Sequence, residues 1–576
     1  MRNNSEYTYQ LFWVLTLSTG VTALFFLLAT AAVAVVARRL ALSSPWVPRI
    51  ISALLIVSCS FSALMLAIIS GFEYIPPEMV LVILCLSWAA LSMLSFFLHT
   101  RTARNTLVSG RTWRQILTMA VRGSVEAAMR RPRYFSMICF AGYCVSFVLV
   151  LSLCDVCYCN NPTEVTTWVS RRNQAHFCEK EKYCHLYVLL GYNSSTVRVV
   201  GHITSDYGIP VAAAAQVCTV SCATNQSRTF QARIIDASDS SGEDPRYVAQ
   251  YTLTGLLGDT VYTAEVSFLL GSGAVAERVI SFRTVPDISS TSNVQFISGG
   301  DLFTGYGGQE YLLTGLTQST NPSFIFFGGD LAYANNNRAC YLRFDNFLAV
   351  LTSMRSQDGL SIPYVLIPGN HESGGYLPEP SWSDYNFFLP FFPQFDSPVA
   401  APGNVTYHTH VVGGVTLVAL DSGLMTPVTD QVGYLKDMLR QHHELGQVLV
   451  VAYHNGMYPS VRSFDNVNAV AVRGAFGPLL DDYCVALALE FHDHAYKRTL
   501  RLHRGAVVPT SACGTLFIGD GGVGLNRPAT NGEWYLNATF TESHIEVVNL
   551  VGRGSLLVRS VTAGGQLLDT SVTDQY

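Results

Sequence analysis

The sequence predicts a multidomain chain in which an all-α transmembrane bundle is followed by a small β-sandwich and then by an α/β domain. Three observations lead to this prediction. The first quarter holds long apolar runs without charged residues, the middle holds short strands that alternate apolar and polar residues, and the last half holds apolar strands that end in polar residues. The length of 576 residues also exceeds that of a usual single domain.

The composition supports membrane segments and gives no sign of a nucleic-acid partner. Only 13% of the residues are charged, against about 25% in a typical soluble protein. The net charge of −5 provides no basic surplus for binding a phosphate backbone. We therefore expect no nucleic acid among the partners.

Residues 1–155 are predicted to form a four-helix transmembrane region in contact with membrane lipid. Each apolar run approaches or exceeds the roughly 20 residues that cross a bilayer as a helix. A cleaved secretory signal is the alternative for the first run, which is longer than the usual signal core of about 7–15 residues. Because the runs contain no charged residue, an anchor is favoured over a transporter. The runs are Gln10–Ala37, Ile50–Gly71, Val80–Leu98 and Phe135–Cys154.

Arginines are concentrated in the loop after the first run and in the loop after the third run. Because positive loops stay cytoplasmic, the chain after Cys154 is predicted to lie on the extracellular or lumenal side. This predicts a multi-pass protein of the plasma membrane or an endomembrane. The glycosylation sequons all fall on the same outer side. They lie at Asn3, Asn193, Asn225, Asn404 and Asn537.

Residues 156–186 are predicted to form a cysteine-containing stalk. The chain has 14 cysteines, and Cys157 and Cys159 stand one residue apart. An outer compartment favours disulfides, although the pairing cannot be deduced from the sequence. A zinc site at Cys157 and Cys159 is the alternative to a disulfide.

Residues 187–286 are predicted to form a β-sandwich, because short alternating strands follow one another without an intervening helix pattern. One stretch, YTLTGLLGDTVYTAEV, resembles a corner of the fibronectin type III domain. The resemblance depends on a leucine, a glycine–leucine pair, a turn and a tyrosine entering the next strand. These residues are Leu253, Gly255, Leu256, Gly258 and Tyr262.

In the last half, apolar strands such as VQFISGGD, SFIFFGGD and VLVVAYHN end in side chains that can bind metals. Buried strands that deliver polar groups at their carboxyl ends are how α/β proteins build sites. Oxygen and imidazole ligands suit one or two hard-to-borderline metals, and the lack of cysteine at these ends argues against structural zinc. The candidates are Asp301, Asp330, Tyr333, Asn370, His371, His454, His492 and His494.

The motifs GGDLAY, PGNHE, AYHNGMY and FHDHAYKR, in this order, resemble the metallophosphoesterase superfamily. Tyr333 and the preceding β-sandwich point to its purple acid phosphatase branch. The resemblance covers about residues 195–576 and implies that residues 293–576 adopt an α/β metallophosphoesterase fold, a β-sandwich core flanked by helices. It also implies Fe(III) paired with divalent Fe, Zn or Mn. The implied iron ligands are Asp301, Tyr333, His494 and the bridging Asp330, and the implied ligands of the divalent metal are Asn370, His454 and His492.

The resemblance implies an acid phosphatase that hydrolyses phosphomonoesters with a metal-activated hydroxide, and the predicted transmembrane region would anchor it to a membrane. His371 is expected to hydrogen-bond the phosphate or protonate the leaving group, with a structural histidine as the alternative. Arg462 is a candidate phosphate contact, with a solvated surface arginine as the alternative. Hydrolysis of phosphodiesters or nucleotides and a non-catalytic surface receptor stay open. The sequence does not indicate an oligomeric state.

Two family glycines are replaced in this chain. Phe303 follows the first aspartate motif, and Phe491 precedes the paired histidines His492 and His494. If the second glycine serves a positive φ, phenylalanine would strain the turn there. We expect instead that Phe491 lines the substrate pocket.

Overall fold

The computed structural model describes most of the chain from residue 183 to residue 575, and it divides the protein into two compact units. Met1–Ser170 and Tyr376–Pro378 form one unit, which lies outside the described residues. Everything below concerns the other unit. The described ranges are 183–204, 209–219, 222, 227–237, 246–289, 294–302, 313–317, 321–333, 341–373, 388–393, 406–519, 521–524, 526–529, 532–552, 554–562 and 564–575.

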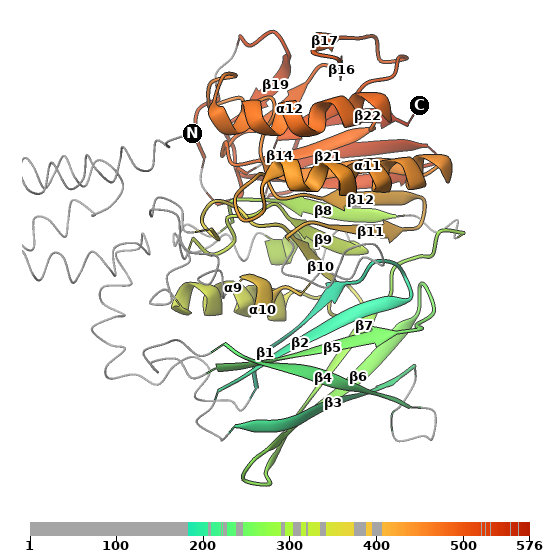
Figure 1. Cartoon of the computed structure of the whole chain (residues 1–576), viewed down its shortest axis with the longest axis vertical. Coiled ribbons are helices and arrows are strands. Elements are labelled where there is room, and N and C mark those ends of the chain that lie inside the picture. The colour runs from blue at the N-terminus through green and yellow to red at the C-terminus, as the bar shows by residue number, and fades with distance from the viewer. Residues whose placement is uncertain are drawn as a thin grey trace, which may run out of the picture. The chain divides into compact units, whose positions relative to one another are not determined.

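Seven antiparallel strands form a β-sandwich at the beginning of the described chain (Figure 1). Their apolar side chains meet in one core, where Tyr251 and Phe268 contact each other edge to face at 6.4 Å between ring centroids. Tyr183, the first residue of β1, lies inside the predicted stalk 156–186. The strands are β1 (Tyr183–Leu190), β2 (Thr196–Thr204), β3 (Pro210–Cys218), β4 (Arg228–Asp236), β5 (Arg246–Thr254), β6 (Val261–Leu270) and β7 (Val275–Arg283), paired in the order β1-β2-β5-β4-β3-β6-β7.

The first sheet of the C-terminal part continues from the sandwich through one parallel pair, Leu189 with Tyr364. Within this sheet β8, β9 and β10 run parallel, and the last three strands of the chain add to it antiparallel. The strands are β8 (Gln295–Gly299), β9 (Phe324–Phe327), β10 (Tyr364–Leu366), β20 (His544–Val551), β21 (Ser555–Thr562) and β22 (Leu567–Asp574), in the order β22-β21-β20-β8-β9-β10.

The second sheet has parallel strands β12, β13, β14 and β18 at its centre. Its members are β11 (His408–Val412), β12 (Val415–Ala419), β13 (Val448–Asn455), β14 (Leu487–Phe491), β18 (Leu516–Gly519), β15 (Tyr496–Thr499) and β19 (Leu536–Phe540). A separate hairpin consists of β16 (Leu502–His503) and β17 (Ala506–Val507). The helices are α9 (Tyr341–Ser353), α10 (Phe388–Phe391), α11 (Val428–Glu444) and α12 (Val467–Asp482).

The core of the C-terminal part lies between the two sheets, where Phe296 and Phe324 stack at 4.7 Å. Helices α11 and α12 cover the other face of the second sheet, as Figure 1 shows, through residues such as Leu435 and Phe476. Every residue of β13 and β14 is buried. Because both faces of these strands are covered, the sequence reads there as continuous apolar runs.

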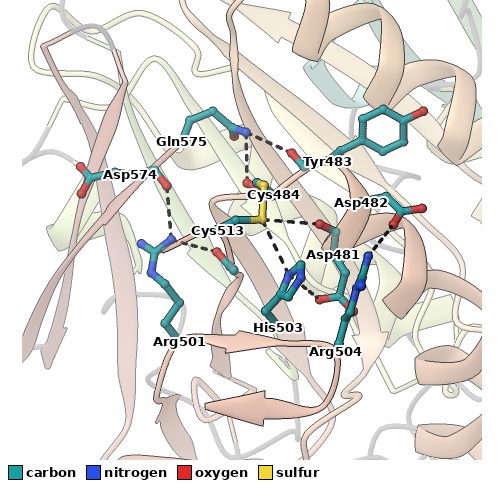
Figure 2. The surroundings of a disulfide bond; sticks show 11 residues. Asp481, Asp482, Tyr483, Cys484, Arg501, His503, Arg504, Cys513, Asp574 and Gln575 are labelled. Atoms are coloured by element: carbon teal, nitrogen blue, oxygen red, sulfur yellow. Dashed lines mark hydrogen bonds and ion pairs between the residues drawn. A yellow bond between two sulfur atoms is a disulfide. The ribbon is translucent and has the colours of Figure 1, made fainter. Parts of the chain in front are cut away.

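The disulfide between Cys484 and Cys513 closes the amino end of β14, opposite the end that leads to His492. Figure 2 shows the last residues of the chain beside it. The Gln575 side-chain amide donates to the carbonyl of Cys484 at 3.0 Å. The guanidinium of Arg501 donates to Thr573 Oγ1 at 2.8 Å. The disulfide and the last residues of the chain therefore both contact the segments that lead into β14 and β18.

Replacing both Cys484 and Cys513 by serine is expected to lower the free energy of unfolding by roughly 3–4 kcal/mol, because a cross-link restricts the unfolded chain in proportion to the logarithm of its loop length. The bond spans a sequence separation of 29, whereas Cys218–Cys222 spans 4. Serine substitution of the short pair should remove only about 2 kcal/mol. Urea unfolding of both variants tests this, and equal losses would contradict it.

The membrane predictions are corrected by the structure. The four apolar runs lie outside the described residues. In the part of the chain that is described, no helix is both long and apolar enough to cross a bilayer. The longest, α11, has 17 residues, about 26 Å at 1.5 Å per residue, and carries charged side chains including Asp430 and Lys436.

This finding overturns the predicted fold class that begins with an all-α transmembrane bundle. The described chain is mostly β-sheet with a few helices. Two further predictions depended on the same bundle: lipid contact through four helices and a multi-pass membrane localisation. Neither is supported by the described structure. Of the predicted glycosylation sites, Asn193 is half-buried and Asn537 is exposed, and the other three lie outside the described residues.

Candidate metal centre

The candidate ligands come from the carboxyl ends of parallel strands in both sheets. Asp301 follows β8, Asp330 follows β9, and Asn370 follows β10. His454 lies at the end of β13, and His492 directly follows β14. Parallel strands present their carboxyl ends at one edge, so residues far apart in the sequence reach the same place.

Four of these side chains form one compact group. Asp301, Asp330, His454 and His492 each offer a ligand atom, and these atoms all lie within 4.8 Å of one another. The rings of His454 and His492 stand 4.9 Å apart. The predicted convergence of Asp301 and Asp330 with imidazoles from the second sheet is thus present in the structure.

The other three predicted ligands lie against this group on two sides. The Tyr333 hydroxyl donates to Asp301 Oδ1 at 3.1 Å and lies 3.2 Å from His494 Nε2. His494 Nε2 is itself 2.8 Å from Asp301 Oδ1. On the other side, Asn370 Oδ1 lies 3.2 Å from His454 Nε2. All seven predicted ligand residues are therefore in one site.

The backbone at this site is held in an unusual conformation. The φ angle is positive, between 52 and 76°, at five residues of the site: Asp301, Asp330, Tyr333, His492 and His494. Non-glycine residues adopt this region rarely, and such strain is found at functional sites. The turns aim side chains from each strand end back toward a common point.

The electrostatics of the group favour a positive charge at its centre. Burial alone would raise the pKa of Asp330, yet His454 and His371 hold it well below its usual range. Burial alone would lower the pKa of His454, but Asp330 raises it to about 9. Asp330 Oδ2 accepts no hydrogen bond from the described residues although it is buried. A carboxylate oxygen in that state, surrounded by imidazole and amide donors, fits a metal ligand.

Glu372 is a residue that the sequence reasoning missed. Its Oε2 accepts from the backbone N–H of Asp330 at 2.7 Å and of Gly369 at 2.8 Å, and its Oε1 accepts from Leu331 N at 2.8 Å. Burial and the nearby Asp330 raise the pKa of Glu372 to about 7. In the sequence, Glu372 is recognisable only as the glutamate of the PGNHE motif. Its hydrogen bonds fix the turns that carry Asp330 and Asn370.

His371 lies beside the predicted ligands. Its ring is 4.1 Å from the ring of Tyr333, and its Nε2 is 3.8 Å from Asp330 Oδ2. Its backbone N–H donates to Asp330 Oδ1 at 2.8 Å. The ring is therefore held at the edge of the candidate centre.

Arg462 faces the turn between the paired histidines. Its Nη1 donates to Asp493 Oδ1 at 2.9 Å and also to the carbonyl of His492. Asp493 accepts from the N–H groups of Ser460 and Val461 at 2.5 and 2.9 Å. Asp493, which the sequence reasoning did not single out, thus joins the His492 turn to the segment after β13.

Phe491 does not line a pocket. It is 1% exposed, lies in the core between the sheets and is 5.7 Å from the ring of Phe326. The positive φ angles fall on His492 and His494 and not on Phe491. The expectation of a pocket residue was wrong because the sequence does not show on which side of the turn the ring lies. Phe303 lies outside the described residues.

Comparisons with known proteins agree with this geometry. Residues 294–496 match the calcineurin-like phosphoesterase family. The C-terminal part of the chain therefore contains a metallophosphoesterase domain, as the motifs predicted. A search of curated proteins found no match. The comparisons do not support the fibronectin type III resemblance or the four-span membrane region.

One solved structure has a similar fold: the purple acid phosphatase PPD1 isolated from yellow lupin (Lupinus luteus) seeds. It has a TM-score of 0.56 and 17% identity, and the match covers 68% of this chain and 74% of that chain. At this identity the likeness shows the fold alone. A glycosyl hydrolase family 2 member from Bacteroides cellulosilyticus matches with a TM-score of 0.21 and 7% identity, covering 54% of this chain and 37% of that chain, which is too weak for any argument.

Proposed function

We propose that this chain, which carries a calcineurin-like metallophosphoesterase domain, is a dinuclear-metal acid phosphatase of the purple acid phosphatase type that hydrolyses phosphomonoesters. The observation that carries the proposal is the group of Asp301, Asp330, His454 and His492, whose ligand atoms lie within 4.8 Å of one another. Two carboxylates and two imidazoles so close together and largely buried suit cations better than any other occupant. The proposed catalytic domain comprises residues 293–576, after the β-sandwich whose strands run from Tyr183 to Arg283.

The proposed ligands divide into two sets that suit two different metals. Asp301, Tyr333 and His494, with contacts of 2.8–3.2 Å among them, would hold Fe(III), because phenolate and carboxylate are hard anionic donors. Asn370, His454 and His492 would hold divalent Fe, Zn or Mn, because a neutral amide and imidazoles suit a divalent ion. Asp330 Oδ2, 3.4 Å from His454 Nε2, would bridge the two sets.

Several contacts prepare these residues for binding. The Gly328 carbonyl, 2.7 Å from His454 Nδ1, fixes the tautomer that leaves Nε2 facing the centre. The backbone N–H of His492 donates a hydrogen bond to Asp301 Oδ2 at 3.0 Å. The other carboxylate oxygen, Oδ1, therefore faces Tyr333 and His494. When bound, the metals supply Lewis acidity and lower the pKa of a water toward about 7.

The chain's own residues would bind and orient the substrate. His371, with Nε2 at the edge of the ligand group, is proposed to hydrogen-bond the phosphate or to pass a proton to the leaving oxygen. Arg462 is 23% exposed in its side chain and is proposed as a phosphate contact that also holds the His492 turn.

Removing the metals from the purified chain with a chelator is expected to abolish hydrolysis of an aryl phosphate, and adding Fe and Zn should restore it. Elemental analysis should find two metal ions per chain, and a tyrosinate on Fe(III) should give a visible absorption band. Circular dichroism controls for unfolding during chelation. A folded chain that binds no metal and hydrolyses no phosphate ester would contradict the proposal and favour a non-catalytic binding protein.

A further inference from the structure

Phe491 is a buried ring that lies directly against the backbone of both aspartate-bearing turns. A Cβ built on Gly300 would lie 2.5 Å from Phe491 Cδ1, and one built on Gly328 would be closer still to three ring atoms. Gly300 precedes Asp301, and Gly328 lies two residues before Asp330. The ring therefore occupies the space that side chains at these two glycines would fill.

The two glycines are needed for space and not for backbone conformation. Neither Gly300 nor Gly328 has a positive φ, whereas Gly329, which follows Gly328 in the turn, has φ +90°. An alanine would be compatible with the backbone at both positions if the ring were absent. Phe491 and the two glycines are thus matched to each other, since a larger residue at any of them requires the others to move.

Each of the four grouped ligands is linked to this contact. His492 follows Phe491 in the chain, and Asp301 follows Gly300. The Gly328 carbonyl accepts from His454 Nδ1 at 2.7 Å, and the Gly328 N–H donates to Gly299 O at 2.9 Å. Asp330 is joined to the same turn, because Asp301 N donates to Gly329 O at 3.0 Å.

We propose that Phe491 is a positioning residue that sets the spacing of Asp301, Asp330, His454 and His492. The ring is planar and rigid, and packed interiors do not deform continuously, so it fixes how closely the turns from β8, β9 and β14 approach one another. A smaller or more flexible side chain leaves a void into which the turns relax. The distances among the four ligand atoms then no longer match those that a bound metal requires. This inference rests on the proposed function, because it assumes that the group binds metal.

The test compares Phe491→Leu with Phe324→Leu in the metal-free full-length chain. Phe324 is 1% exposed and belongs to the same core, where it stacks on Phe296 and not on the ligand turns. Zn²⁺ affinity is measured by competition with a chromophoric chelator, and thermal unfolding is measured alongside. Both variants should unfold at lower temperature, but only Phe491→Leu should bind Zn²⁺ at least about tenfold more weakly. After metals are added back, the kcat of Phe491→Leu for an aryl phosphate should fall while KM changes little.

A reciprocal pair of variants gives a readout that a general packing role does not predict. Gly328→Ala alone should weaken Zn²⁺ binding because its methyl group meets the ring, and combining it with Phe491→Ala should remove that clash. The double variant is expected to bind Zn²⁺ no more weakly than either single variant. Losses that simply add would overturn the inference.

The outcomes separate this inference from the proposed function. If the unaltered chain binds no Zn²⁺, the proposed function fails. If it binds Zn²⁺ and Phe491→Leu matches Phe324→Leu in affinity, the proposed function stands and the inference about Phe491 fails. Phe491→Met, which keeps most of the volume, replaces the leucine variant if that one does not fold, with the same expected direction.

Discussion

Replacing Asp330 by asparagine is expected to lower kcat/KM for an aryl phosphate by about a thousandfold, which corresponds to about 4 kcal/mol of transition-state stabilisation. Asp330 lies between the Tyr333 side and the Asn370 side of the centre, and its Oδ2 accepts no hydrogen bond from the described residues. Asparagine keeps the size and can still accept from the His371 N–H. It removes the negative charge that would bridge two cations, so we expect fewer than two metal ions per chain.

The matched control is Asp437→Asn on α11. Asp437 is exposed and pairs with Arg440 at 3.3 Å, so the same chemical change there should leave activity and metal content unaltered. Elemental analysis, steady-state kinetics and thermal unfolding are measured for both variants. An Asp330→Asn protein that keeps two metals and activity within tenfold of the original would exclude the bridging role.

The site could be predicted to a large extent from the sequence because its ligands follow buried parallel strands. Such strands appear as apolar runs, and the runs that lead to the site are followed by residues that can bind metals. Asp301 after QFISG and His492 after LALEF show this pattern. The shared edge of parallel strands then allowed motifs almost 200 residues apart to be combined into one group.

The supporting residues could not be predicted because their roles depend on partners far away in the sequence. Glu372 binds backbone N–H groups of Asp330 and Leu331, about 40 residues earlier, and a single glutamate in a motif does not indicate this. Phe491 contacts Gly300 and Gly328, more than 160 residues earlier. The membrane prediction depended on hydropathy, arginine placement and sequons, which are properties of composition, and no helix of the described residues is long and apolar enough to cross a bilayer.

Replacing Asp345 by asparagine is expected to lower the free energy of unfolding by about 3–5 kcal/mol at pH 7, because the change leaves a buried arginine charge without this carboxylate. Asp345 on α9 accepts from Arg246 Nη1 and Nη2 at 2.8 and 3.0 Å and lies 2.9 Å from His185 Nε2. Arg246 and His185 belong to the β-sandwich and are fully buried. The cluster therefore joins the sandwich to the helix that follows the Asp330 turn.

The same cluster has a defined pH dependence. Burial would raise the pKa of Asp345, but Arg246 and His185 together hold it well below its usual range. A carboxyl group with a depressed pKa in the folded state adds stability that is fully present above its unfolded pKa of about 3.9 and is lost as the pH falls further. The stabilisation should thus be complete at the mildly acidic pH at which the proposed acid phosphatase would work.

Urea unfolding at pH 7, 5 and 3 tests this dependence. The difference between the original chain and Asp345→Asn should be equal at pH 7 and 5 and smaller at pH 3, because below about pH 3.9 the unfolded original chain takes up a proton on Asp345 while the folded chain keeps this carboxylate charged. The control is Asp358→Asn, whose half-exposed partner Arg283 lies 3.3 Å away, and its expected effect is below about 1 kcal/mol at every pH. An Asp345→Asn protein as stable as this control at pH 7 would mean that the buried cluster does not hold the sandwich and α9 together.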